Sequence, residues 1–377
     1  MVSHLHIGIA MNAFKGSLSA VEAAEAVRRG LERSRLSCHI HLMPLADGGD
    51  GTLEAMLTQP GSTRRRLIVQ NPLGESIEAA YGILADGETA VIEMALASGL
   101  ARLGSRRDAL RATTYGTGEL MHHAIKQGAK RIIVGVGGSA TVDGGAGCMQ
   151  ALGVQLLDST GAPISYGGGS LHQLAQVEPN PALENVEILV LCDVDNPPLG
   201  KHGAARIFGP QKGASPQQVE LLEKNLTHYF SIIAEQTGRD VRELPGGGAA
   251  GALAGGLAAL GGAKLVPGAE TLIRFLNYED RIKTCDLIFT GEGSIDAQTE
   301  HGKAPAVIAA KAAENGIPAI AIAGSIPADA DTLIRSNLQA AFSLVPAPVS
   351  LEDAIQHSAE WLSNTAQNIG NLLAINL

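Results

Sequence analysis

Three glycine-rich segments carry most of the side chains that could do chemistry in this chain, and each follows a short apolar run. They read Ala46-Asp47-Gly48-Gly49-Asp50-Gly51-Thr52, Gly137-Gly138-Ser139-Ala140-Thr141-Val142-Asp143-Gly144-Gly145 and Gly291-Glu292-Gly293-Ser294-Ile295-Asp296. Glycine lets backbone N–H groups come close to an anion, and a helix that starts after such a loop adds the positive end of its dipole. One such loop is as often a plain strand-to-helix turn, but its repetition predicts phosphate or ATP at Gly137, Gly138, Ser139, Ala140, Thr141, Gly291, Gly293 and Ser294.

One cation and several carboxylates accompany these loops, and together they suit phosphoryl transfer. That reaction depends on positioning and on neutralising charge around phosphate oxygens. The sequence shows no nucleophilic Cys, Ser–His pair or His cluster for another chemistry. Lys15, on the loop after the first apolar strand, is predicted to neutralise the transferring phosphoryl group. Glu292 and Asp296 are four residues apart, so either both face Mg²⁺ bound to ATP or one of them caps the following segment.

A further polar segment, Asp193-Val194-Asp195-Asn196-Pro197-Pro198, follows the apolar run 188–192. It could hold a substrate hydroxyl or a metal, and its alternative is an Asx turn before proline. We choose Asp193 as the general base because it could face Lys15 across a cleft between domains. We expect Asp47, Gly48, Gly49 and Asp195 to bind the substrate, although Asp47 and Asp195 remain alternatives for the base.

Composition excludes several other classes of function. The net charge of −10 and the 3% aromatic content leave neither a basic patch nor a stacking surface for nucleic acid. The four widely spaced cysteines contain no Cys-x-x-Cys pair, which indicates a cytoplasmic protein with small buried cysteines. The uncharged stretch 244–263 is mostly Gly and Ala, so a membrane span is not expected. A homo-oligomer is compatible with the sequence.

Two other classes compete with a kinase. Gly135-Val136-Gly137-Gly138-Ser139-Ala140 fits the dinucleotide-binding pattern, and Asp158 lies 18 residues beyond Ala140, so an NAD(P)-dependent dehydrogenase acting on a small hydroxy acid is one alternative. It leaves the other two glycine loops unexplained. A non-catalytic protein that binds a phosphorylated or acidic ligand would not explain the carboxylates. No Walker motif is present, so the kinase would lie outside the P-loop class.

The elements that must position these loops indicate an α/β fold. Strands are expected at 6–10, 38–45, 66–70, 77–84, 89–94, 131–136, 154–157, 188–192, 286–290 and 318–323, and helices at 20–34, 118–127, 216–237 and 305–315. Both ends of the chain show parallel α/β texture, whereas turns such as 71–74 and 86–87 mark antiparallel strands between them. We therefore predict a doubly wound, mostly parallel, Rossmann- or flavodoxin-like domain from residues 1–70 and 283–377, with residues 71–282 inserted as a mixed α/β domain.

Six motifs, in this order, resemble those of the bacterial type I glycerate kinase family (glycerate 2-kinases). They are Ala-Met-Asn-Ala-Phe-Lys15-Gly-Ser-Leu, Pro-Leu-Ala-Asp47-Gly-Gly-Asp50-Gly-Thr, Val-Gly-Gly-Ser139-Ala-Thr-Val-Asp143-Gly-Gly-Ala-Gly, Cys-Asp193-Val-Asp195-Asn-Pro, Phe-Gly-Pro-Gln-Lys212-Gly-Ala and Thr-Gly-Glu292-Gly-Ser-Ile-Asp296-Ala-Gln-Thr. The resemblance implies ATP-dependent phosphorylation of D-glycerate to 2-phosphoglycerate by a cytosolic enzyme whose active site lies between two domains. Many members have Asp-Ser where this chain has Asn12-Ala13. Which loop binds ATP and which binds glycerate stays open, as does the role of Lys212.

Overall fold

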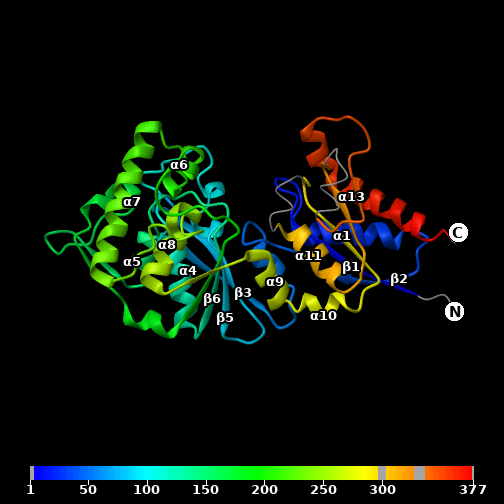
Figure 1. Ribbon diagram of the computed structural model, residues 1–377, viewed down its shortest axis with the longest axis horizontal. Helices are drawn as coiled ribbons and strands as arrows, with labels where there is room; N and C mark the ends of the chain where they lie inside the picture. The colour runs from blue at the N-terminus through cyan, green and yellow to red at the C-terminus, as the bar shows by residue number, and fades with distance from the viewer. Residues whose placement is uncertain (1–3, 296–302, 327–335, 376–377) are drawn as a thin grey trace. The chain divides into compact units, whose positions relative to one another are not determined.

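The chain folds into two compact units, and a computed structural model describes residues 4–295, 303–326 and 336–375 of it (Figure 1). Unit 1 is formed by Met1–Asp47 with Ala269–Leu377, and unit 2 by Gly48–Gly268. The predicted boundaries after residues 70 and 282 differ from these. The strand that ends at Gln70 is hydrogen-bonded into the sheet of unit 2, and the segment from Ala269 to Ile282 belongs to unit 1.

Unit 1 is built on a five-stranded parallel sheet in the order β13-β12-β11-β1-β2. The strands are β1 (Leu5–Met11), β2 (Cys38–Leu42), β11 (Leu287–Gly291), β12 (Ala319–Ala323) and β13 (Ala340–Ser343). Counted within the unit, this is the 2-1-3-4-5 order of flavodoxin-like sheets. The chain moves in opposite directions from β1 to β2 and from β11 to β12, so right-handed crossovers place the two connecting helices on opposite faces.

Five helices of unit 1 are described: α1 (Ala20–Glu32), α9 (Gly268–Phe275), α10 (Tyr278–Ile282), α11 (Ala304–Glu314) and α13 (Leu351–Leu373). A capping box opens α1, since Ser19 Oγ accepts from the N–H of Glu22 while the Glu22 carboxylate accepts from that of Ser19. α1 packs against α13. Gly30 permits that close approach, because a Cβ atom there would lie 2.1 Å from the carbonyl oxygen of Ser363.

Unit 2 contains a six-stranded mixed sheet in the order β10-β9-β6-β5-β4-β3. The strands β5 (Thr89–Glu93), β6 (Arg131–Gly135), β9 (Glu187–Leu191) and β10 (Lys264–Val266) are parallel, and β3 (Thr63–Gln70) and β4 (Ser76–Ile83) are antiparallel. Around it lie α2 (Thr52–Met56), α3 (Ala95–Ser98), α4 (Tyr115–Lys126), α5 (Ala146–Ala151), α6 (Ala204–Phe208), α7 (Pro216–Thr237) and α8 (Ala249–Gly261), and β7 (Gln155–Leu157) pairs with β8 (Gln176–Glu178). The helix predicted at 216–237 is therefore confirmed.

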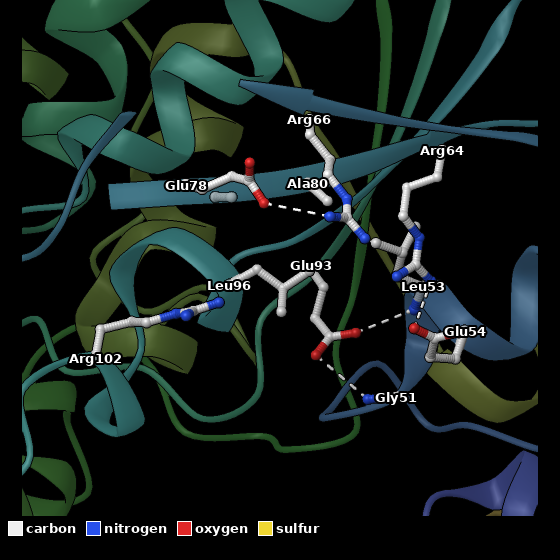
Figure 2. A pocket seen from close by; sticks show the side chains of 11 residues that line it. Gly51, Leu53, Glu54, Arg64, Arg66, Glu78, Ala80, Glu93, Leu96 and Arg102 are labelled. Atoms are coloured by element: carbon white, nitrogen blue, oxygen red, sulfur yellow. Dashed lines mark hydrogen bonds and ion pairs between the residues drawn. The ribbon is translucent and has the colours of Figure 1, made fainter. Parts of the chain in front are cut away.

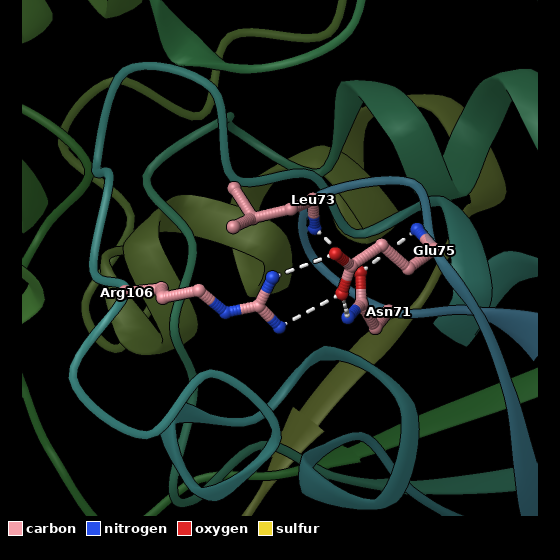
Figure 3. Close-up of polar contacts among 4 residues, drawn as sticks. All are labelled: Asn71, Leu73, Glu75 and Arg106. Carbon is pink, nitrogen blue, oxygen red and sulfur yellow. Dashed lines mark hydrogen bonds and ion pairs between the residues drawn. The ribbon is translucent and has the colours of Figure 1, made fainter.

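The predicted turn between β3 and β4 is held by a polar cluster (Figure 3). Asn71 Oδ1 accepts from the N–H groups of Leu73 and Glu75, at 2.9 and 3.0 Å. The Arg106 guanidinium donates to both carboxylate oxygens of Glu75, at 2.6 and 2.9 Å, and these bonds lower the pKa of Glu75 to about 2. This two-point ion pair ties the segment after the short helix at 100–102 to the hairpin.

The structure also bears on the predictions for the uncharged stretch 244–263 and for the cysteines. The uncharged stretch 244–263 contributes only the 13-residue helix α8, and within the described ranges no helix is long and apolar enough to span a membrane. Of the cysteines, Cys148 and Cys285 are buried as expected, whereas Cys38 and Cys192 are only half-buried.

Candidate active site

In unit 1, Lys15 lies on the loop that follows β1. Phe14 and Leu18 close a tight turn, because the Phe14 N–H donates to Leu18 O at 2.8 Å and the Leu18 N–H donates back at 3.0 Å. Gly16, with a φ of 78°, forms the tip of that turn. Lys15 is exposed beside it. The loop thus offers one ammonium group at the carboxyl edge of the sheet.

The third glycine loop follows β11, the strand next to β1. Gly291 allows close packing there, since a Cβ atom on it would lie 1.9 Å from Ile322 O. Gly293 O accepts from the N–H of Ser325 at 3.1 Å, and the N–H of Ile295 donates to Ser325 O at 3.0 Å. Ser294 therefore lies in a short bridge to the segment after β12.

The two carboxylates expected to bind a metal differ in what the structure says of them. Glu292 is only 8% exposed, and its Oε1 lies 3.7 Å from Lys303 Nζ. Asp296 lies outside the described residues. Over the described ranges, no group of three or more metal-ligating side chains is found.

Asp47 is the last residue of unit 1 and is half-buried. The segment before it continues β2 alongside β1, because the Met43 N–H donates to Ile9 O and that of Leu45 to Met11 O, both at 2.8 Å. Carboxyl ends of parallel strands meet at one edge, where ligands of such sheets bind. Lys15, Asp47 and Glu292 all follow strands that end at this edge of unit 1.

In unit 2, two glycine loops that sequence reasoning treated separately are in direct backbone contact. The N–H of Gly137 donates to Gly48 O at 3.1 Å, and a Cβ atom on Gly137 would lie 2.4 Å from the Cα of Gly49. Gly48 in turn lies against Leu191, where a Cβ atom would approach Leu191 Cβ to 2.7 Å. The loop expected to bind substrate and the loop expected to bind phosphate therefore form one surface.

Glu93, at the end of β5, holds the first of these loops, and sequence reasoning missed it. The side chain is 5% exposed; Oε1 accepts from the Gly51 N–H at 3.3 Å and Oε2 from that of Leu53 at 3.1 Å. Burial raises the pKa of this carboxyl. Glu93 therefore bonds the start of α2. The available signal was a carboxylate closing an otherwise apolar run.

Figure 2 shows Glu93 in a pocket that three arginines also line: Arg64 and Arg66 from β3, and Arg102 from the segment after α3. Arg64 is ion-paired with Glu54, and Arg66 Nη1 lies 3.4 Å from Glu78 Oε1. Each of these two arginines thus has a carboxylate partner at the pocket wall.

The start of α5 is occupied from within the protein. Asp143 is fully buried; its Oδ2 accepts from the Thr114 N–H at 2.8 Å and from the Gly147 N–H at 3.3 Å, and its Oδ1 accepts from the Gly145 N–H at 3.1 Å. Burial raises the pKa of this carboxyl. The expectation that a phosphate uses the N-terminus of this helix is therefore corrected, because Asp143 already binds those donors.

Lys212 is a second buried ionisable group that contacts the segment 137–145. It is 1% exposed, and its Nζ donates to Ser139 Oγ at 2.8 Å and to Thr141 O at 2.7 Å. Burial lowers the pKa of Lys212 to about 7, against the opposing charge of Asp143. Hydrogen bonds from buried Lys212 thus fix two residues of the loop 137–141.

Asp193 follows β9, the neighbour of β6, and its Oδ1 accepts from the Gly268 N–H at 2.7 Å. Gly135 and Leu191 are paired in register, so Asp193 and Gly137 each lie two residues beyond that pair. The structure therefore brings Asp193 to the same edge as the loop 137–141. Asp195 is exposed on the same segment, where Asn196 Nδ2 donates to His202 O at 2.9 Å.

The dinucleotide-binding pattern lacks its structural context. In that motif a helix opens within the glycine pattern, whereas α5 begins only at Ala146, well after Ala140. Asp158 follows β7, which lies outside the parallel sheet, and its Oδ1 accepts from the N–H groups of Thr160 and Ala162. The dehydrogenase alternative is wrong on this geometry.

Comparisons with known proteins point to one family. The model of the glycerate kinase family matches residues 7–374. A glycerate kinase of Halalkalibacterium halodurans is 44% identical over 367 residues, which cover 96% of this chain and 97% of that protein. The glycerate 2-kinase of Escherichia coli is 43% identical over 377 residues, covering 99% of each. The crystal structure of a Salmonella typhimurium LT2 protein named glycerate kinase 2 matches with a TM-score of 0.87 at 42% identity, covering 98% of both chains.

The low pKa of Lys212 predicts a pH-dependent stability. The unfolded chain keeps this proton up to an ordinary pKa of 10.5, whereas the folded protein releases it near 7. Between these values the unfolded state binds more protons, so the free energy of unfolding gains from rising pH. Relative to Lys212→Met, the free energy of unfolding of the wild type should rise by roughly 1 kcal/mol per pH unit between pH 7 and 9.5. Urea unfolding of both proteins measures this, and a constant difference would contradict it. Lys126→Met, which removes an exposed lysine at the end of α4, is the control.

Proposed function

Because this chain belongs to the glycerate kinase family, we propose that it transfers the γ-phosphoryl group of ATP to the 2-hydroxyl group of D-glycerate in the cytoplasm. The chain is a kinase, and the comparisons do not support the dehydrogenase alternative. The observation that carries the proposal is the family match along nearly the whole chain. Glycine loops that follow parallel strands in both units support it.

We assign the phosphate-binding role in unit 2 to the loop 137–141. The N–H groups of Gly137 and Ala140 already donate to Gly48 O and Ser98 O. Within the part of the chain that the structure describes, those of Gly138 and Ser139 donate to no protein acceptor, and Gly138 is exposed with a φ of 68°. These two amides are the donors that this loop can offer to an anion.

In unit 1 we assign phosphate contacts to Gly291, Gly293 and Ser294, and charge neutralisation to Lys15. Magnesium with a nucleotide is usually held by one or two carboxylates together with phosphate oxygens, so a cage of protein ligands is not required. Glu292, a mostly buried carboxylate at the end of β11, fits that coordination. Bound there with ATP, Mg²⁺ would neutralise charge on the phosphates.

For the general base we retain Asp193. Its Oδ1 accepts from the Gly268 N–H at 2.7 Å, which orients the carboxylate that would accept the proton of the substrate hydroxyl. Its strand neighbours that of the loop 137–141. Asp47, Gly48, Gly49 and Asp195 are assigned to binding of the substrate hydroxyls and carboxylate.

The test of the function is an ADP-release assay with ATP and Mg²⁺ across D-glycerate, L-glycerate, lactate and tartronate, with the product identified by ³¹P NMR. We expect turnover with D-glycerate and a phosphorus signal coupled to the proton at carbon 2. Coupling to the two protons at carbon 3 would show that the 3-hydroxyl is the acceptor. No ADP release with any of these acids would reject the proposal.

Lys15→Met should lower kcat by about 10³-fold without unfolding the protein, because a cation that neutralises the transferring phosphoryl group acts mainly in the transition state. Circular dichroism serves to verify the fold. Lys201→Met, which removes another exposed lysine, should leave kcat within about twofold, in the range of neutral surface changes. Near-normal turnover of Lys15→Met would remove Lys15 from the catalytic groups.

Asp193→Asn should lower kcat by about 10²- to 10⁴-fold and abolish the acid limb of its pH profile, because the amide cannot accept the hydroxyl proton. Asp195→Asn, two residues away, should mainly raise KM for glycerate, and Asp47→Asn should do the same. If Asp193→Asn keeps both kcat and the acid limb while one of the other two loses them, that other residue is the base.

A further inference from the structure

Lys212 is a buried cation, and packing alone does not account for the free-energy cost of burying it. An ammonium group removed from water costs several kcal/mol unless it is paired and hydrogen-bonded. Lys212 Nζ is bonded only to two neutral oxygens among the contacts described, Ser139 Oγ and Thr141 O. Both oxygens belong to the loop assigned above to phosphate. Lys212 therefore anchors the loop 137–141 through two hydrogen bonds.

The bond to Ser139 fixes the direction of a hydroxyl proton. A serine hydroxyl carries one donor hydrogen and two acceptor lone pairs. While it carries its proton, Lys212 has no lone pair with which to accept. Its Nζ therefore donates to Ser139 Oγ, occupies one lone pair of that oxygen and leaves the serine hydrogen to point elsewhere. Ser139 lies between exposed Gly138 and buried Ala140, with 8% of its surface exposed.

We propose that Lys212 is a positioning residue that orients the Ser139 hydroxyl as a hydrogen-bond donor to a phosphoryl oxygen of the bound nucleotide. This inference rests on the proposed function, which it deepens by naming how one loop recognises phosphate. Ser139 touches the substrate, whereas Lys212 acts through it. The Gly138 and Ser139 N–H groups and the Ser139 O–H would then bind one anion together.

The second bond of Lys212 keeps the loop from relaxing. Thr141 O also packs closely against the start of α8, because a Cβ atom on Gly251 would lie 1.9 Å from this oxygen. Ala250, Gly251 and Ala252 all have positive φ angles, of 56°, 67° and 68°, and this left-handed turn makes the close approach. With Thr141 O held between α8 and Lys212, the distance from Lys212 to Ser139 is set by the scaffold.

The experiment is a double-mutant cycle on the full chain, with Lys212→Met, Ser139→Ala and both together. If Lys212 acts through Ser139, each single variant should lower kcat by about 10²-fold, in line with the loss of one oriented donor. The double variant should fall by about the same 10² rather than by the 10⁴ expected of independent groups. KM for glycerate should stay within about threefold, since the affected contact is made to the nucleotide. Ser139→Thr, which keeps the hydroxyl, should retain more activity than Ser139→Ala, and Lys126→Met is the matched control for loss of a lysine.

Several outcomes would overturn the inference. A double variant whose loss equals the product of the single losses would show that the two groups act independently. Ser139→Ala with kcat within threefold of wild type would do so even where Lys212→Met fails to fold. A Lys212→Met protein with lower urea stability but normal kcat per folded molecule would leave Lys212 a merely structural residue.

Calorimetric titration with ATP and Mg²⁺ separates this inference from the proposed function. If the wild type binds ATP but does not phosphorylate D-glycerate, the function is wrong. The inference is then decided by Kd, which both single variants and the double variant should raise by about the same factor of ten. Equal Kd values for wild type and Ser139→Ala would overturn it.

Discussion

The contact between two glycine backbones, at Gly48–Gly49 and Gly137, determines how the functional edge of unit 2 is built. A side chain at Gly137 would collide with the main chain of Gly49, and one at Gly48 would collide with Leu191. Because no side chains intervene, the loop after β6 and the segment that begins unit 2 lie at main-chain contact distance. The strand pairing of β6 with β9 then sets Asp193 beside them. Small displacements of one loop must therefore move the others.

Three ionisable side chains keep that edge in place, and each is buried. Glu93 binds amides before and within α2, Asp143 binds amides at the start of α5, and Lys212 binds the loop between Ser139 and Thr141. Each charged group bonds directly to the main chain of a loop. Buried polar groups of this kind are costly unless they are satisfied, and once satisfied they specify one geometry. Unit 2 thus gains a rigid loop arrangement from groups that lie behind the surface they support.

Period and turn chemistry made most strands and the helix at 216–237 predictable, because apolar runs bounded by glycine and proline have few alternatives. The ordered motifs also made the family predictable. The buried groups could not be found in this way, since Glu93 and Lys212 look like ordinary polar residues until the sheet brings their partners, distant in sequence, to them. The predicted boundary after residue 70 differs from that of the compact units for a related reason: only the pairing of β3 with β4 places residues 63–70 in the sheet of unit 2. α13 and β13 were not predicted, and the short strand β10 carries too few residues for a pattern.

The position of β1 in its sheet has a consequence for the order in which the chain can fold as it leaves the ribosome. β1 lies between β2 and β11, so one side of this early strand has no partner until residues 287–291 have been synthesised. α1 likewise awaits α13, the last helix. Unit 2 is complete in sequence by Gly268 and can form its own core first. The apolar N-terminal segment must therefore remain without its full sheet through most of translation, a window in which unpaired strand edges favour aggregation.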